Sequence, residues 1–243
     1  MIYHTNGIVL KTIKYGETSV VVNIFTALFG IQSYLVNGVR TSGKSGKAHF
    51  FQPTSMLELE VYHNELKNLQ RIKECKWSYL YRNLWQDVIK NSVALYMTEL
   101  LQKGLKQPET NSDLFSFCED AFVQLDCANE TVTANYPLYF CLNLAQFFGL
   151  KLEDTFSPRR PILDLQDGTF IEQPPPHPYF LEMNNSFCIS QLLKARHPND
   201  LDQIRLNKTI RKELLSSLQT YYSLHIQDFG ALKTLPVLHE LLS

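Results

Sequence analysis

The sequence predicts an α+β protein in which a small antiparallel barrel is followed by a mainly α-helical domain. In the first 75 or so residues, apolar side chains alternate with a period of two, and from Trp77 onward they recur every three or four residues. The charge also changes sign. Residues 1–79 hold nine Lys and Arg against five Asp and Glu, a net +4, whereas residues 80–243 hold fourteen against nineteen, a net −5. We therefore expect two domains, residues 1–78 and 79–243.

Five strands are expected in the first domain, each bounded by turn residues. Their expected ranges are about 7–14, 18–26, 31–39, 55–62 and 66–74. In the second strand, Val20, Val22 and Ile24 share one face, which is typical of a half-buried strand. Five short antiparallel strands match an OB-type barrel, a fold that commonly holds oligonucleotides. A small sandwich or an SH3-like barrel fits the strand count as an alternative.

A basic segment lies between the third and fourth expected strands. Arg40, Lys44 and Lys47 have no acidic residue between them, and three nearby glycines permit unusual backbone conformations. Lys11 and Lys14, at the end of the first strand, add two further cations. Cations of this kind bind the phosphate backbone of nucleic acids. We interpret these five residues as candidate DNA contacts; the alternative is that the lysines only keep the surface solvated.

Aromatic residues accompany these cations in the sequence. Tyr34 lies in the third strand, and Tyr15 and Phe51 lie near the basic positions. Bases of single-stranded DNA stack on such rings without strong sequence preference. We therefore include Tyr34 among the candidate DNA-binding residues, while noting that it also fits an ordinary strand position.

The second domain is expected to be helical, with one irregular insertion. Helices are predicted at about 81–104, 112–125, 133–148, 190–195, 207–224 and 232–242. Residues 151–187 are rich in proline and turn residues, which forbid long helices, and a short hairpin is expected at 162–171. The apolar stripes of the helices are interpreted as bundle core.

A second basic cluster lies near the end of the chain. Arg205, Lys208 and Lys212 are spaced so that a continuous helix would carry them on one face, with Arg211 alongside. Residues 159–160, both arginine, extend the set. This face is a candidate continuation of a DNA path, and a solvated helix surface is the alternative.

Catalytic motifs are absent from the sequence. No Walker-type, dinucleotide-binding, nucleophile-elbow or His-Glu-x-x-His motif occurs. Asp164, Asp167 and Glu172 form an acidic group that would suit a Mg²⁺-dependent nuclease, but they surround an expected turn. The five scattered cysteines lack zinc-site spacing and are interpreted as buried thiols. With no long apolar run and no signal-peptide pattern, the protein is expected to be cytoplasmic, without membrane contact.

Short motifs along the whole chain resemble those of one known family. They are residues 7–12 (GIVLKT), 15–19 (YGETS), 38–40 (GVR), 52–53 (QP) and 232–238 (LKTLPVL). Their order resembles the RecO family of bacterial DNA repair proteins. The N-terminal motifs are the specific ones.

The resemblance implies an OB-fold domain, a helical domain and no enzymatic turnover. It also implies binding of single- and double-stranded DNA, annealing of complementary strands, cooperation with RecR, contact with the SSB C-terminal tail, and indirect help to RecA. It carries over Lys11, Arg40, Lys44 and Lys47 as DNA contacts. Many members have a four-cysteine zinc module after the third helix, but residues 156–187 contain no cysteine. No zinc or other cofactor is therefore expected. The main alternative is a non-catalytic protein-interaction adaptor.

Overall fold

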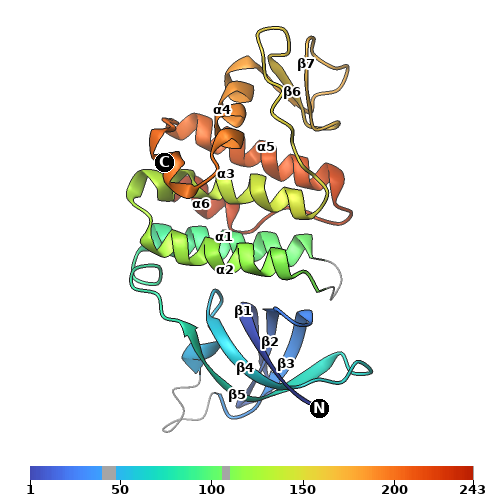
Figure 1. The fold of residues 1–243 in the computed structure, drawn as a ribbon, viewed down its shortest axis with the longest axis vertical. Coiled ribbons are helices and arrows are strands. Elements are labelled where there is room, and N and C mark those ends of the chain that lie inside the picture. The colour runs from blue at the N-terminus through green and yellow to red at the C-terminus, as the bar shows by residue number, and fades with distance from the viewer. Residues whose placement is uncertain (40–47, 106–109, 243) are drawn as a thin grey trace. The chain divides into compact units, whose positions relative to one another are not determined.

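A computed structural model of the chain describes residues 1–39, 48–105 and 110–242 (Figure 1). The chain divides into two compact units. The first consists of Met1–Arg82 with Leu101–Val123, and the second of Asn83–Leu100 with Gln124–Ser243. The first unit contains a β-barrel, and the second contains most of the helices together with a small sheet.

The first unit is built on a closed five-stranded barrel. Its strands are β1 (Ile2–Tyr15), β2 (Ser19–Thr26), β3 (Gly30–Val36), β4 (Met56–Tyr62) and β5 (Leu69–Tyr79). They follow the order β1-β2-β3-β5-β4, and β4 pairs with β1 to close the barrel. Only the β3–β5 pairing among these strands is parallel. This topology is that of an OB-type barrel, and the predicted fold class is confirmed.

Strand β1 closes the barrel because it pairs with two neighbours. Its first half pairs with β4 and its second half with β2, and a β-bulge lies between Val9 and Lys11. At Gly7, a Cβ atom would lie 2.6 Å from the Cγ2 atom of Ile24 and 2.9 Å from the Cδ1 atom of Leu59. The strands approach so closely there that only glycine fits.

The ranges of three strands differ from the sequence expectation by three or more residues, and one of them, β3, ends at Val36 instead of residue 39. β1 begins at Ile2, before the expected residue 7, because pairing with β4 continues to Tyr62. β5 runs from Leu69 to Tyr79, three to five residues later than expected. The Gln70 side chain explains the shift: its amide group donates to the Asn64 carbonyl (2.9 Å) and accepts from the Asn64 N–H (3.0 Å), which closes the β4–β5 hairpin before the strand begins.

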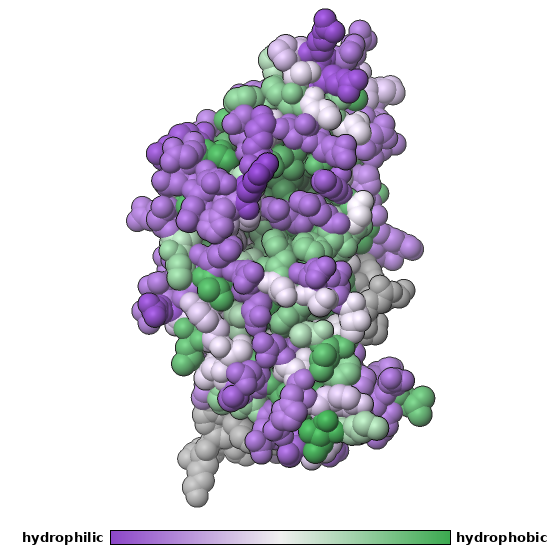
Figure 2. Space-filling view, viewed as in Figure 1, coloured by the Kyte–Doolittle hydropathy of each residue, from purple (hydrophilic) through white to green (hydrophobic). Residues whose placement is uncertain are grey.

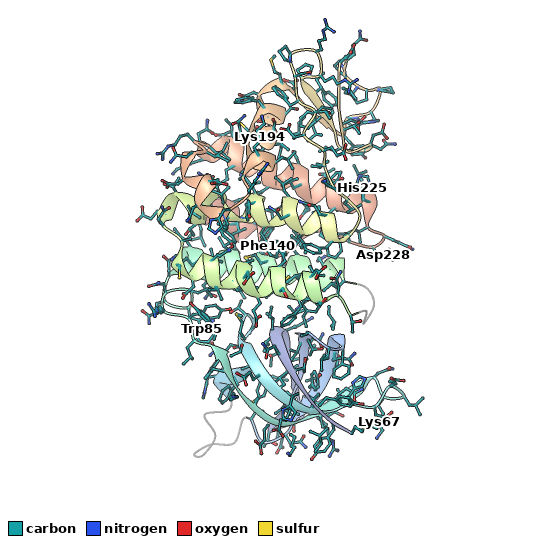
Figure 3. The ribbon with its side chains drawn as sticks, viewed as in Figure 1. Lys67, Trp85, Phe140, Lys194, His225 and Asp228 are labelled. Atoms are coloured by element: carbon teal, nitrogen blue, oxygen red, sulfur yellow. The ribbon has the colours of Figure 1, made fainter. Side chains whose placement is uncertain are left out.

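The second unit packs its helices around a central buried helix. The helices of the chain are α1 (Val88–Gly104), α2 (Ser112–Cys127), α3 (Glu130–Phe147), α4 (Met183–Lys194), α5 (Lys208–His225) and α6 (Leu235–Leu241), with short 3-10 helices η1 (Ala48–Phe51) and η2 (Pro198–Gln203). Helix α3 is buried along most of its length, and Phe140 at its middle has no exposed surface (Figure 3). The Tyr222 hydroxyl donates to the Cys141 carbonyl (2.8 Å), which fixes α5 against α3.

The insertion between α3 and α4 forms a three-stranded sheet. Strands β6 (Ile162–Asp164), β7 (Thr169–Ile171) and β8 (Phe180–Leu181) follow the order β7-β6-β8, so the predicted hairpin is confirmed. The Ser186 hydroxyl accepts from the Leu163 N–H and donates to the Leu181 carbonyl, both at 2.8 Å. Helix α4 therefore begins at Met183, seven residues before the predicted start, since its first turn completes this network.

Hydrophilic side chains cover much of the face shown in Figure 2, and apolar side chains lie between them in separate groups. None of the helices in the described part of the chain is long and apolar enough to cross a membrane. None of the five cysteines forms a disulfide.

Candidate nucleic-acid interface

The basic segment, residues 40–47, is attached to the barrel at two buried anchors. Val39 precedes it and is 4% exposed, and Phe51 follows it closely and is 2% exposed. Both side chains belong to the core of the barrel. Arg40, Lys44 and Lys47 lie outside the described residues. The described chain therefore stops at one core residue before the cationic stretch and returns to the core at another after it.

Lys11 and Lys14 are both exposed, but they lie on opposite faces of β1. Before the bulge, Val9 faces the core with Ile24; after it, Thr12 pairs with the core residue Val22. The extra residue therefore reverses the alternation and turns Lys11 outward. Lys14, two residues after Thr12, lies on the face of β1 that Thr12 presents to the barrel interior.

The two lysines consequently have different surroundings. Lys11 pairs in register with Asn23, whose side-chain oxygen accepts from the Ser33 hydroxyl (3.0 Å), so it belongs to a polar row across β1, β2 and β3. On the other face of β1, the Thr12 hydroxyl donates to the Phe51 carbonyl (2.5 Å). Lys14 thus lies on the side of the second anchor of the basic segment.

Tyr34 is buried and cannot stack on a base. Its side chain has no exposed surface and lies in the barrel core opposite Val22. Burial also raises the pKa of its hydroxyl. The prediction that Tyr34 binds DNA is therefore wrong, because its ring packs the barrel. Phe51 is buried for the same reason, whereas Tyr15 is 56% exposed and stays available for stacking.

A group of rings that the sequence analysis missed lies beside the second anchor. We call His49, Phe50 and Trp77 the aromatic cluster. The Trp77 ring centroid lies 4.9 Å from that of Phe50 and 5.7 Å from that of His49, and the His49 and Phe50 rings are 4.5 Å apart. Phe50 and Trp77 are half-buried, and His49 is exposed. The signal in the sequence was the pair of aromatic residues that follows the basic segment.

Two other barrel lysines are neutralised by carboxylates. The ammonium group of Lys73 lies 2.8 Å from Glu60, and that of Lys76 lies 2.6 Å from Glu58. The hydrogen bond from Lys73 lowers the pKa of Glu60. These lysines are therefore paired with acidic neighbours and are weak candidates for phosphate contacts.

The second basic cluster is only partly assembled as predicted. Helix α5 begins at Lys208, and Asn207 caps it by accepting from the Ile210 N–H (2.8 Å). Arg205 precedes the cap, so the predicted helical face does not include it. Lys208 and Lys212 are exposed one helical turn apart and do share a face.

Arg211 is a structural residue of the second unit. Its guanidinium group donates to the Asn135 side chain (3.3 Å), the Leu242 carbonyl (3.1 Å) and the Leu206 carbonyl (3.0 Å). Burial lowers the pKa of this group. All three of its nitrogen atoms have protein partners, so Arg211 is a weaker candidate for a DNA contact than the exposed Lys208 and Lys212.

The acidic group of the insertion has a structural use. Asp164 is 3% exposed, accepts from the N–H groups of Gln166 (2.7 Å) and Asp167 (3.2 Å), and lies 3.4 Å from the Nε2 atom of His177. It therefore shapes the β6–β7 turn. In residues 1–39, 48–105 and 110–242, no three His, Cys, Asp or Glu side chains are grouped so that they would hold a metal ion.

The fold and the site define a class: an OB-type barrel that carries cations and exposed rings, combined with a helical unit. Comparison with known families gives the particular one. The family model described as "Recombination protein O N terminal" matches residues 1–81, and "Recombination protein O C terminal" matches residues 86–157.

Similar full-length proteins carry the same family name. The DNA repair protein RecO of Azobacteroides pseudotrichonymphae is 30% identical, and the alignment covers 99% of both chains. That of Phocaeicola vulgatus is 32% identical over 100% of both chains, and that of Christiangramia forsetii is 32% identical over 99% of both. The chain belongs to the RecO family, and this membership supports a role in DNA repair.

Proposed function

We propose that this protein is a non-catalytic recombination mediator that binds single- and double-stranded DNA through its barrel. The observation that carries the proposal concerns the residues on either side of the basic segment: Val39 and Phe51 are buried in the barrel core, and the exposed ring of His49 lies beside Phe51. Cations beside exposed rings suit a strand whose phosphates are neutralised while its bases stack.

The mechanism follows from this chemistry. Lysine and arginine side chains neutralise phosphates and release counterions, so that two complementary strands held in one positive field repel each other less. The rings accept any base, which makes annealing tolerant of sequence. In the cytoplasm, we propose, the protein acts with RecR on SSB-coated DNA and so assists the loading of RecA.

A groove in the second unit supports contact with the SSB C-terminal tail. It has a volume of about 720 Å³ and lies at the N-terminal ends of α3 and α5, with Leu206, Leu241 and Lys208 among its lining residues. Lys208 opens α5, whose first turn contains no acidic residue. The N-terminus of a helix carries a partial positive charge, so a lysine placed there is repelled by the helix dipole. An anion bound at that position is attracted both by the lysine and by the dipole. The lining holds Lys90, Lys208 and Arg211 against Asp87 and Glu130, a formal charge of +1, so an acidic tail with an apolar end is compatible with the groove.

The test of DNA binding is fluorescence anisotropy of a labelled single strand between about 50 and 200 mM salt, a range over which several phosphate contacts cost orders of magnitude in affinity. The variant carries Arg40→Glu, Lys44→Glu and Lys47→Glu. We expect it to lose most of its affinity and most of its salt dependence. Lys67→Glu is the control, because Lys67 is exposed in the β4–β5 hairpin, before β5 begins (Figure 3). Trp77, which belongs to the aromatic cluster, lies near the other end of β5.

Binding that is insensitive to salt, or equal in the wild type and the triple variant, would contradict the proposal. Survival of DNA binding in the triple variant would favour the protein-interaction adaptor. Cleavage of labelled DNA in Mg²⁺ or Mn²⁺ would instead favour a nuclease.

The test of the tail site is a labelled acidic peptide that ends in an aromatic residue. Lys208→Glu should weaken its binding about tenfold, within the range measured for close charge pairs at interfaces. Lys212→Glu makes the same charge change one turn further along α5, outside the groove lining, and should have a smaller effect. Equal losses would mean that only the overall charge matters.

A further inference from the structure

The outer surface of β1, β4 and β5 carries a groove that the DNA-binding proposal does not use. Its volume is about 700 Å³, and it is completed by the β2–β3 turn and by α2, all within the first unit. We call it the acidic groove. Glu58, Glu60, Glu74 and Glu119 line it, together with one lysine, Lys76. With histidine neutral, the lining therefore carries a formal charge of −3.

Strand pairing explains why the carboxylates gather there. His4 on β1 is in register with Glu60 on β4, and Glu60 is in register with Glu74 on β5. Cross-strand partners point to the same face of a sheet. The three side chains thus form one row on the outside of the barrel.

The carboxylates are not all neutralised by neighbours. Glu58 pairs with Lys76, and Glu60 pairs with Lys73. Glu119 accepts a hydrogen bond from the Asn6 amide group (3.2 Å), a neutral donor, and burial raises its pKa. Glu74 is exposed at the end of the row.

Apolar surface completes the groove. Phe115 on α2 is 4% exposed and packs against Phe25 at a centroid distance of 5.4 Å, which provides a fixed apolar wall. Leu28, in the β2–β3 turn, is 47% exposed at the rim. A volume of about 700 Å³ lies within the range of ordinary ligand pockets, and the mixture of apolar wall and carboxylates defines what would fill it.

Several occupants are disfavoured by these observations. DNA would be repelled by a lining of net negative charge. In the described part of the chain, no three candidate ligands are close enough to hold a metal ion, so a divalent cation lacks a site. The barrel strands are paired all round, which leaves no edge for an added β-strand. The remaining occupant with matching chemistry is a cationic protein segment that also carries apolar side chains.

We propose that the acidic groove is a docking site for a segment of a partner protein that bears lysine or arginine residues around an apolar side chain. The apolar residue packs against Phe115 and Leu28, while the cations meet Glu74 and Glu119. The partner thus binds a barrel surface of opposite charge to the basic segment, so that DNA and the partner need not compete. This proposal goes beyond DNA binding and does not depend on it.

The probe is a fluorescein-labelled ten-residue peptide with four lysines, two leucines and four glycines, and its counterpart has glutamate in place of lysine. At low salt, we expect the lysine peptide to bind the full-length protein and the glutamate peptide not to bind it. Glu74→Gln with Glu119→Gln should weaken this binding about tenfold, since each partly exposed pair contributes up to about fivefold. Glu17→Gln with Glu65→Gln removes the same charge from exposed positions outside the groove and should change it less than about twofold.

Two results would overturn the proposal. One is equal weakening of lysine-peptide binding by the two double variants, and the other is equal binding of the lysine and glutamate peptides to the wild type.

Two further outcomes separate the possibilities. Dimerisation in sedimentation experiments that disappears in Glu74→Gln with Glu119→Gln would assign the groove to a second copy of the chain and overturn the partner proposal. Retained affinity of this double variant for single-stranded DNA shows that the barrel is folded. It also shows that the acidic groove and the DNA surface act separately.

Discussion

The acidic residues of the barrel and several of its basic residues lie in different places. The outside of β4 and β5 carries Glu58, Glu60 and Glu74, three of the five acidic residues among the first 79. Of the cations that are not paired with these carboxylates, Lys11 and Lys14 lie toward the end of β1, Lys67 and Arg71 lie at the β4–β5 hairpin and the start of β5, and three belong to the basic segment. The difference shows that the alternation of strand residues, and not the net charge of the region alone, decides where charged side chains gather.

The β-bulge in β1 maintains this separation. His4, before the bulge, and Lys11, after it, both face outward although their positions differ in parity. Without the extra residue, Lys11 would point into the barrel. One inserted residue therefore allows a single strand to line the acidic groove at one end and to present a cation at the other.

The largest expected effect concerns the closure of the barrel, on which the acidic groove and the proposed DNA surface both depend. Gly7→Ala places a Cβ atom 2.6 Å from Ile24 and 2.9 Å from Leu59, where the barrel closes. Overpacking of this kind costs about 1–3 kcal/mol, and the melting temperature should fall by about 5 °C. Thermal unfolding followed by circular dichroism measures it, with the exposed Thr18→Ala as the control. An unchanged melting temperature would show that Ile24 and Leu59 move aside without cost and would contradict the prediction.

A smaller effect should touch only the DNA surface. His49→Ala removes the exposed ring of the aromatic cluster and should weaken single-strand binding by about 1 kcal/mol, roughly fivefold. Duplex DNA, whose bases are already stacked, should be affected less. His4→Ala is the matched control, because His4 is exposed on the acidic groove. Fluorescence anisotropy with labelled single-stranded and duplex DNA measures the affinities of both variants. Equal losses of affinity in His49→Ala and His4→Ala would contradict the separation of the two surfaces.

The smallest effect should concern only the acidic groove. Burial raises the pKa of Glu119 above its usual 4.5, so the folded state binds this proton more tightly than the unfolded state does. Its stabilising contribution is present below this value and is lost as the pH rises through the folded pKa. Glu119→Gln should therefore make stability less dependent on pH above 4.5. The change should stay below about 1 kcal/mol, because water reaches the half-buried carboxyl group.

Urea unfolding at two pH values, one slightly above 4.5 and one near neutrality, measures this effect. The conservative change keeps a side-chain oxygen that can accept from Asn6. A steeper pH dependence in the variant than in the wild type would contradict the assignment.

The sequence allowed the barrel to be predicted because strand alternation is local. Val20, Val22 and Ile24 do face the core, as their spacing indicated. The error at Tyr34 arose because the direction of its side chain is set by the pairing of Tyr34 with the core residue Val22 on the neighbouring strand. The sequence of one strand does not reveal that pairing. Phe51, next to the basic segment, was considered for stacking but is buried, whereas His49 and Phe50 beside it were not predicted to contribute.

The candidate site in the second unit shows the same limit at longer range. Arg211 was one more cation on a predicted helix, yet its partners include Asn135 and Leu242, which are 76 and 31 positions away. Contacts across such separations depend on the packing of α3, α5 and the chain after α6. Spacing within a single helix therefore cannot distinguish a structural arginine from an exposed lysine such as Lys212.

The two anchors of the basic segment also bear on how this protein can change. Val39 and Phe51 are held by the barrel core, and the strand register does not depend on the number of residues between them. The entropic cost of a longer connection grows only slowly with its length. Insertions, deletions or exchange of residues 40–47 can therefore change the length and charge of this connection during evolution, or by grafting in the laboratory, without refolding the barrel.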